Sequence, residues 1–321
     1  MDKFKYQPLD LEDQSFRLIQ LFRGVLGPIQ CNLFHSRFQD AEDVIEYEAL
    51  SYTWGGNDKA YSIEVNGVET AVTKNLFTAL RNLRTPHRDR ILWIDAICID
   101  QNSDKERGHQ VQQMGTIYKR AEQVVIWLGE ATAETDLVFQ SVRALEERMI
   151  QYACNDWNSR DNRWSEHWSS IQSELEAKYG NLKAQQRKGL NNLLSRPWFK
   201  RIWIIQEVAN ARAATVICGS QSVSARIFSL IIPLIGITPP HHCQAIFDIM
   251  PGPARKHSWW MRDRRLHSLL IMFRASEASD QRDIIYALLG ISSDGCDSNI
   301  LRPDYEKSEE EVVQVTLSFL L

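Results

Sequence analysis

The run ILWIDAICI, Ile91–Ile99, is apolar at every position except Asp95. A run of this kind is typical of a strand that is buried on both faces, as in a parallel sheet. Helical spacing of apolar residues follows over Ser103–Ala121, and a second short apolar run, Val124–Leu128, ends at a glycine. Strand, helix and strand with short connections form a βαβ unit, so the sequence predicts an α/β fold with a parallel sheet.

Further strands and a hairpin are predicted on the N-terminal side of this unit. The alternating or apolar runs Phe16–Phe22, Ile29–Leu33 and Tyr47–Trp54 are typical of strands. The dipeptide Asn66-Gly67 separates two short strand patterns, Tyr61–Val65 and Val68–Val72, and predicts a hairpin. A helix is expected over Asn75–Leu83, where the apolar residues share one face.

The C-terminal side of the unit is predicted to be mainly helical. We expect an irregular insertion or a loose helical excursion at about 150–182, where tryptophans alternate with polar residues, and a loop over Pro239–Pro253. The expected helices are Lys183–Leu194, Pro197–Asn210, Trp259–Arg274 and Arg282–Leu289, with a strand at Thr215–Cys218. We therefore place an α/β core at 16–220, including the insertion, and a helical extension at 221–321.

The last predicted helix begins at Ser308, with Glu311 three residues later as in a capping box. It stays apolar up to Leu321, where the sequence stops. A chain that stops inside an apolar helix has the pattern of a truncated one, so we expect a fragment of a longer protein.

Composition argues against several classes of function. The 321 residues are 44% hydrophobic and 24% charged with a net charge of −4, which gives no reason to expect binding to nucleic acid or to a membrane. The six cysteines are scattered without a Cys-x-x-Cys pair, which argues against a zinc site and fits a reducing, cytoplasmic location. His241-His242-Cys243 has no second group of ligands at useful spacing, so we predict a surface loop and no metal site. No tightly bound cofactor is expected.

Trp203 and Glu207 lie four residues apart in a predicted helix, so they share a face. A carboxylate beside an indole is partly desolvated, which raises its pKa and suits it to acid–base or charge-stabilising work. The structural alternative is a core tryptophan with Glu207 in water or paired with Arg201.

Two other segments place polar or flexible residues at strand ends. Asp95 interrupts an apolar run and needs partners if it is buried, and Asp100 lies where that strand should end. Ligand sites in open α/β sheets lie at the carboxyl ends of strands. Ser51–Gly56 ends another strand with aromatic residues that can stack on a base or sugar, and with glycines that allow close backbone approach. The alternatives are that Asp95 accepts hydrogen bonds from a neighbouring loop, that Asp100 helps to cap the following helix, and that Ser51–Gly56 is a tight turn with packed aromatics.

These segments together resemble the fungal heterokaryon incompatibility (HET) domain over about residues 16–290. The stretches that carry the resemblance are Tyr47–Gly55, Leu92–Gln101, Glu106, Gln110, Met114, Ile117-Tyr118, Ala121, Trp127–Gly129, Arg196–Trp203, Gln206-Glu207 and Asp280–Gly290. Membership implies an effector of vegetative incompatibility and programmed cell death. It also implies an incompatibility partner protein.

The HET domain is in turn distantly similar to TIR domains, which have a flavodoxin-like parallel sheet. Trp203 and Glu207 match the TIR Trp-Cys-x-x-Glu spacing, with Ile204 in place of the cysteine. That similarity implies NAD cleavage with Glu207 as the catalytic residue, and an active form that self-associates. The expected NAD-binding residues are Ser51, Tyr52, Trp54, Gly55, Asp95, Asp100, Arg201 and Trp203. Because many TIR domains are scaffolds, a non-catalytic signalling module is the alternative.

Overall fold

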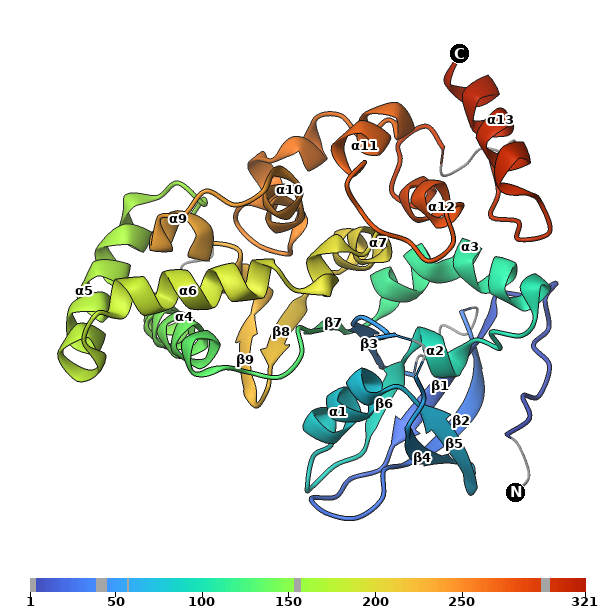
Figure 1. Cartoon of the computed structure of the whole chain (residues 1–321), viewed down its shortest axis with the longest axis horizontal. Helices are drawn as coiled ribbons and strands as arrows, with labels where there is room; N and C mark the ends of the chain where they lie inside the picture. Colours follow the sequence, from blue (N-terminus) through green and yellow to red (C-terminus); the bar gives the residue numbers. More distant parts are fainter. Residues whose placement is uncertain (1–3, 39–44, 57, 153–156, 296–300) are drawn as a thin grey trace.

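The structure is a computed structural model that describes residues 4–38, 45–56, 58–152, 157–295 and 301–321. Within these residues, nine strands form one sheet in the order β5-β4-β2-β1-β6-β3-β7-β8-β9 (Figure 1). The strands are β1 (Ser15–Leu21), β2 (Gln30–Arg37), β3 (Glu48–Ser51), β4 (Tyr61–Val65), β5 (Val68–Val72), β6 (Arg90–Trp93), β7 (Gln123–Trp127), β8 (Ala214–Cys218) and β9 (Gln221–Ser224).

The centre of the sheet is parallel and its flanks are mainly antiparallel. β3 pairs in parallel with β6 and β7, and β7 pairs in parallel with β8. All four residues of β3 are buried, as are Val124–Trp127 of β7, and burial on both faces explains why Val124–Trp127 is apolar at every position. β1 pairs antiparallel with β2 and β6, and β8 with β9. The α/β class with a sheet flanked by helices is thus confirmed, but the sheet is mixed where the sequence led us to expect parallel strands.

Helices surround this sheet and form the C-terminal part of the described chain (Figure 1). The α-helices are α1 (Lys74–Leu83), α2 (Asp95–Cys98), α3 (Asp104–Arg120), α4 (Ala133–Gln151), α5 (Asn162–Tyr179), α6 (Leu182–Leu194), α7 (Trp203–Asn210), α8 (Ala225–Phe228), α9 (Ile231–Ile235), α10 (His241–Ile249), α11 (Leu266–Met272), α12 (Asp283–Leu289) and α13 (Glu309–Leu320). Short 3₁₀ turns occur at η2 (Pro197–Lys200), η3 (Arg255–His257) and η4 (Trp259–Met261). α7 packs against α3, α12 and β3, at the middle of the fold.

The predicted hairpin is confirmed. β4 and β5 pair antiparallel from Tyr61 with Val72 to Val65 with Val68. Asn66 and Gly67 between them have φ angles of 51° and 79°, the left-handed values that a type I′ turn requires at both central positions. The predicted capping box at Ser308 and Glu311 is confirmed at the start of α13.

The expected strand over Ile91–Ile99 is wrong in its second half. β6 ends at Trp93, and α2 begins at Asp95. The Asp95 carboxylate accepts the Ala96 N–H at 2.7 Å, and the Cys98 N–H returns to the Ile94 carbonyl at 2.7 Å. Hydrogen bonds from an aspartate to the nearby backbone compete with strand pairing. A short run of apolar residues is compatible with a buried strand and with a buried helix, so the pattern alone could not decide between them.

The expected helix over Pro197–Asn210 is also interrupted. η2 and α7 are separated at Arg201, whose backbone is extended and forms a bridge with Glu277. The Ile202 N–H donates to the Glu277 carbonyl at 3.0 Å, and the Glu277 N–H donates to the Lys200 carbonyl at 2.6 Å. Pairing with a segment distant in the sequence therefore overrides the helical pattern here.

Two further expectations need correction, one alternative is decided and one strand was missed. The sequence left an irregular insertion or a loose helical excursion open at about 150–182, and residues 162–179 of it form the regular helix α5, which buries Trp164, Trp168 and Ile171 along one side. Within Pro239–Pro253, α10 buries Cys243, Ala245, Ile246, Phe247 and Ile249, an apolar face that the flanking Pro and His residues concealed. The helix expected over Trp259–Arg274 is divided into η4 and α11, because Asp263 accepts the Arg265 N–H at 3.1 Å and starts a new turn. β9 was not predicted, since Val223 alone of its four residues is buried.

Over the described residues, no helix is long and apolar enough to cross a bilayer. The division into a core at 16–220 and an extension at 221–321 stays a prediction.

Candidate functional site

Arg201 lies at the centre of a buried polar cluster that joins all three segments singled out in the sequence. Its Nη2 contacts the Asp95 carboxylate at 2.9 Å, and its Nη1 contacts the Glu207 carboxylate at 3.3 Å. The same Nη1 donates to the Tyr52 carbonyl at 2.7 Å. The indole N–H of Trp54 donates to the Asp95 carboxylate at 2.9 Å. Arg201 thus reaches a residue 149 positions earlier in the chain, and we call the residues that meet at its guanidinium, together with Trp54, the Arg201 cluster.

The fold explains why these residues meet. Tyr52 and Trp54 follow the end of β3, and Asp95 follows the end of β6, its parallel neighbour. The carboxyl ends of parallel strands lie at the same edge of a sheet, where ligands bind in open α/β folds. α7 packs against β3 and brings Glu207 to this edge. The extended backbone at Arg201 directs its side chain toward both carboxylates.

Glu207 is fully enclosed, with an exposed fraction of 0%. Burial raises its pKa to about 7, and the Arg201 guanidinium and the Ser51 hydroxyl oppose that rise. The Oε2 atom of Glu207 has no hydrogen-bond partner among the described residues. A carboxyl group with a pKa near neutrality and one unused oxygen is available for proton transfer or for charge stabilisation.

Ser51 lies between Glu207 and a neighbouring tryptophan. The indole N–H of Trp198 donates to Ser51 Oγ at 2.9 Å, and both side chains are buried. Because Ser51 Oγ accepts from Trp198, its own proton remains to face an acceptor such as Glu207. Tyr52 is buried as well, and burial raises the pKa of its phenol well above the ordinary value. Ser51 and Tyr52 thus form the inner wall of the Arg201 cluster.

Trp203 shares α7 with Glu207, as predicted, but its indole nitrogen has a different partner. Trp203 Nε1 donates to the Asp283 carboxylate at 2.9 Å, and the Tyr305 hydroxyl donates to the other oxygen of Asp283 at 2.6 Å. Burial raises the pKa of Asp283, and these two hydrogen bonds oppose the rise. Trp203 therefore ties α7 to α12.

Trp54 and Gly55 form the accessible side of the cluster. Trp54 is 37% exposed, although its indole N–H reaches Asp95. Gly55 has a φ angle of 76°, and a Cβ atom there would lie 2.9 Å from the Asn75 side chain. Asn75 in turn donates to the Thr53 carbonyl at 2.6 Å and accepts from the Trp127 indole at 3.0 Å. The turn after β3 is therefore held firmly and requires glycine at position 55.

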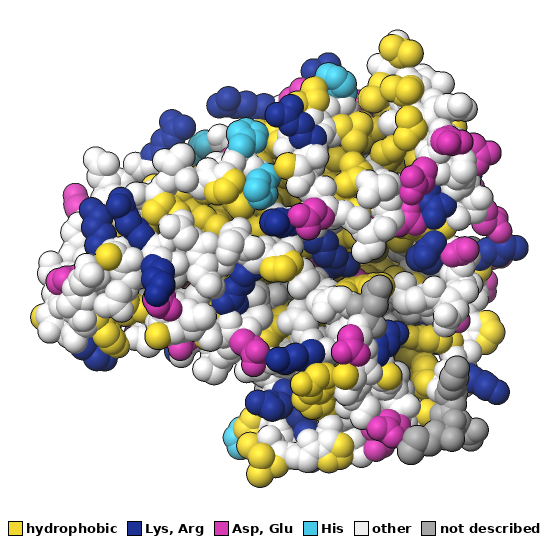
Figure 2. All heavy atoms as spheres, in the orientation of Figure 1, with side chains coloured by type: hydrophobic (Ala, Val, Ile, Leu, Met, Phe, Trp, Pro, Cys, Tyr) yellow, Lys and Arg dark blue, Asp and Glu magenta, His cyan; other side chains and the backbone are white. Residues whose placement is uncertain are grey.

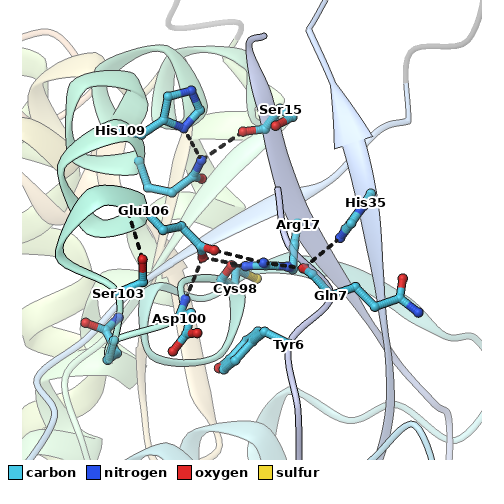
Figure 3. Close-up of polar contacts among 12 residues, drawn as sticks. Tyr6, Gln7, Ser15, Arg17, His35, Cys98, Asp100, Ser103, Glu106 and His109 are labelled. Atoms are coloured by element: carbon cyan, nitrogen blue, oxygen red, sulfur yellow. Dashed lines mark hydrogen bonds and ion pairs between the residues drawn. The ribbon is translucent and has the colours of Figure 1, made fainter. Parts of the chain in front are cut away.

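Asp100 is separated from the Arg201 cluster by its contacts. Its carboxylate accepts from the Asn102 backbone, and its backbone N–H donates to Glu106 at 2.7 Å. Glu106 forms a buried ion pair with Arg17 at 2.6 Å, and Arg17 also donates to the Cys98 carbonyl at 3.0 Å (Figure 3). Asp100 thus belongs to a second buried network, the Arg17 network, which also holds the end of α2.

Arg201 and Glu207 line none of four well-formed cavities of about 400 to 640 Å³ in the part of the chain that the structure describes. Other side chains line these four cavities. Glu207 is 0% exposed in this conformation, so a ligand can reach its carboxylate only after neighbouring groups such as Arg201 move. Over the same described residues, no group of three or more His, Cys, Asp or Glu side chains is placed to hold a metal ion.

Several contributors to the site were not predicted from the sequence. They are Trp198, which binds Ser51; Asn75, which fixes the turn; and Asp283 and Tyr305, which hold Trp203. Trp198 and Asp283 lie within stretches that resemble the HET domain, and that resemblance could have pointed to them. No pattern in the sequence pointed to Asn75 or Tyr305 as part of the site.

Comparison with known proteins supports the resemblance. A family model described as heterokaryon incompatibility protein (HET) matches residues 47–207, half of the chain, and its bounds enclose the whole Arg201 cluster. The heterokaryon incompatibility protein 6, OR allele, of Neurospora crassa is 27% identical over 359 residues. That match covers 95% of this chain, which spans about half (51%) of the relative's length. No solved structure matches the chain. From the extent of the family match, the chain belongs to the heterokaryon incompatibility (HET) family.

Proposed function

We propose that this chain acts in heterokaryon incompatibility as an effector of cell death, and that it does so by cleaving NAD at the Arg201 cluster. Membership of the HET family and the name of the Neurospora relative support the first part. The TIR-like spacing of Trp203 and Glu207 supports the second. We extend the proposal to a TIR-like topology for the core, to self-association and to an incompatibility partner protein.

The catalytic proposal rests mainly on the environment of the Glu207 carboxyl group. It is fully buried, its pKa is raised to about 7, and one of its oxygens has no partner among the described residues. The cluster also lies at the carboxyl ends of β3 and β6, where α/β proteins bind ligands. A carboxylate kept in a desolvated place with an unused oxygen is suited to a cationic transition state.

The chemistry assigns a role to each residue. Trp54 and Gly55, on the accessible side, would contact the dinucleotide. Arg201 would move away from Glu207 so that the ribose can reach the carboxylate. The bond from the nicotinamide nitrogen to the ribose breaks, its electron pair leaves with neutral nicotinamide, and the ribose becomes an oxocarbenium ion. The Glu207 carboxylate stabilises that cation until water adds and releases a proton, giving ADP-ribose. Trp203 would hold α7 in place, and Asp95 would hold Trp54. Asp100 has no part in this scheme because it bonds within the Arg17 network.

One observation favours a non-catalytic signalling module instead. Glu207 is 0% exposed and already paired with Arg201, as a structural ion pair would be. In that case the Arg201 cluster only joins α7 to the sheet, and cell death follows from binding a partner or a second copy.

The two functions are separated by nicotinamide release and by killing. Purified protein at high concentration is incubated with NAD, and nicotinamide is followed by chromatography for the wild type, Glu207→Gln and Glu166→Gln. Glu166 is exposed on α5 and serves as the matched control. We expect release by the wild type and the control, and loss of release in Glu207→Gln. No release by any of them, or equal release by all, rejects NAD cleavage.

In fungal cells the same variants test the signalling alternative. If Glu207→Gln still assembles but no longer kills, the scaffold function is rejected. If it kills as well as the wild type, the catalytic function is rejected. Circular dichroism of each variant shows whether the fold is intact.

A further inference from the structure

Two adjoining cavities of about 640 and 530 Å³ form one groove that is separate from the Arg201 cluster. They share Asn158, Lys256 and His257 in their walls. One wall is the segment 157–160 before α5, a second is the start of β8 with the end of β9, and the third is the segment 251–262 between α10 and α11. We call this the basic groove.

The basic groove is lined by cations. Its described walls contain six Arg and Lys side chains and no Asp or Glu, although the whole chain carries a net charge of −4. The six are Arg160, Arg212, Arg226, Arg255, Lys256 and Arg262. Leaving Arg226 aside, none of them forms an ion pair with another described residue. Figure 2 shows Lys, Arg and His side chains gathered along the upper edge of the molecule, over the segment that joins α10 to α11.

Arg255 is held in place by contacts with the protein. Its Nη1 donates to the Ala211 carbonyl at 3.0 Å, which fixes the guanidinium against the protein. Arg255 and Arg264 both lie over the Trp260 ring, at 5.1 and 4.5 Å from its centre. Burial lowers the pKa of Arg255, and the positive charge of Arg264 lowers it further. A cation held beside a like charge and away from water gains from a bound anion, because the anion supplies the charge that the protein does not.

We propose that the basic groove binds a small ligand that carries several phosphate groups. Guanidinium groups bind phosphate oxygens through paired hydrogen bonds, and a group of them around one hollow favours several phosphates over a single carboxylate. The concave shape and the volume of the larger cavity suit a small molecule, since ligand sites commonly enclose about 300–1,000 Å³. The phosphates can belong to a soluble metabolite or to an inositol phospholipid headgroup.

The groove is independent of the proposed NAD site. Ala213 and Ala214 in its wall stand at the amino end of β8. Ser51 and Tyr52 stand at the carboxyl end of β3, and β3, β7 and β8 run parallel. The two sites therefore occupy opposite edges of the sheet. A ligand in the basic groove would join the segment before α5, the sheet edge and the C-terminal helices.

Calorimetric titration of the purified chain with tripolyphosphate and with inositol hexakisphosphate, in about 0.15 M salt, tests the proposal. Lys256 and Arg262 are exposed, so the double variant Lys256→Glu/Arg262→Glu should fold. We expect it to bind about a hundredfold more weakly than the wild type, at roughly tenfold for each cation removed. The double variant Arg81→Glu/Lys119→Glu makes the same charge change at exposed positions on α1 and α3, and should keep wild-type affinity.

Three results with these two probes would overturn the proposal: no binding of either probe by the wild type, unchanged binding by the groove variant, or an equal decrease in the control variant. Vesicles with and without phosphatidylinositol bisphosphate separate the two sources. Capture of the bisphosphate vesicles by the wild type and not by the groove variant assigns a lipid headgroup, and binding of the soluble probes alone assigns a free metabolite. Tighter binding of a short DNA duplex than of either probe, absent in the groove variant, would replace the small ligand with nucleic acid and reject the proposal.

Discussion

Replacement of Glu207 by glutamine should make the protein increasingly more stable than the wild type as the pH rises. Burial raises the pKa of Glu207 from an ordinary value of 4.5 to about 7, so the folded chain holds this proton more tightly than the unfolded chain. Between these two pH values the folded state binds more protons, and the wild type therefore loses stability as the pH increases. Glutamine has a similar shape and stays neutral at every pH, so its variant lacks this loss.

The size of the effect follows from the pKa difference. At about 1.4 kcal/mol for each pH unit, ionising Glu207 in the folded state costs about 3 kcal/mol by a pH of about 8, and almost none at a pH of about 4.5. The two proteins should thus have similar free energies of unfolding at the acidic end of this range. At the alkaline end the glutamine variant should exceed the wild type by about 3 kcal/mol. Titrating groups distant from Glu207 affect both proteins alike and cancel in the difference.

Urea denaturation of both proteins at pH values of about 4.5, 6 and 8, followed by tryptophan fluorescence, measures this difference. For a chain of this size, about 3 kcal/mol moves the urea midpoint by roughly 0.5 to 1 M. Glu166→Gln changes an exposed residue that is in water in both states, so its difference from the wild type should stay flat with pH. A difference for Glu207→Gln that is constant with pH, or that shrinks as pH rises, would refute the reasoning about its burial.

Three other contacts are tested by substitution, each by urea denaturation at neutral pH. Arg17→Met leaves Glu106 buried without its cation and should lower the free energy of unfolding by about 3–5 kcal/mol. Adding Glu106→Leu should restore part of this stability, and a double variant as unstable as the single one would contradict the prediction. Trp203→Phe removes one of the two hydrogen bonds to buried Asp283 and should cost about 1–3 kcal/mol, so an unchanged midpoint would show that Asp283 finds another donor. Gly189→Ala places a Cβ atom against the Glu134 carbonyl oxygen, closer than a Cβ atom can approach, and should destabilise the packing of α6 on α4. As a control, the Cβ atom of Gly108→Ala meets its nearest atom at 3.5 Å, so this substitution should stabilise α3 by about 0.5–1 kcal/mol. Equal effects of the two glycine substitutions would contradict the packing.

Local sequence patterns predicted much of the sheet because each of these patterns is compatible with only one backbone conformation. Asn66-Gly67 specifies a turn with two left-handed residues, and the structure has that turn. The apolar run Val124–Leu128 is too short for a helix and became the buried strand β7. By contrast, Ile91–Ile99 is buried whether it is extended or helical, so its pattern could not reveal the change of conformation at Asp95.

The partners in the candidate site could not be predicted from such patterns. Asp95 was expected to need partners, but the partner, Arg201, lies 106 residues away in the sequence. Arg201 reaches Asp95 because Lys200 and Ile202 bond to the backbone of Glu277, a pairing that leaves no trace in the local sequence. Contacts between distant segments, more than local propensity, therefore determine which side chains meet.

The short helix α2 constrains how the Arg201 cluster can open. Asp95, at its start, binds Arg201 and Trp54, while the carbonyl of Cys98, at its end, accepts a hydrogen bond from Arg17 at 3.0 Å. The Tyr6 hydroxyl donates to the Ile97 carbonyl at 3.0 Å, so α2 is held on its far side by contacts that do not involve Arg201. If Arg201 leaves Asp95, the buried Arg17–Glu106 pair keeps α2 in place. An opening of the cluster that leaves α2 in place would therefore move Arg201, which contacts Glu207, and would leave Asp95 where it is.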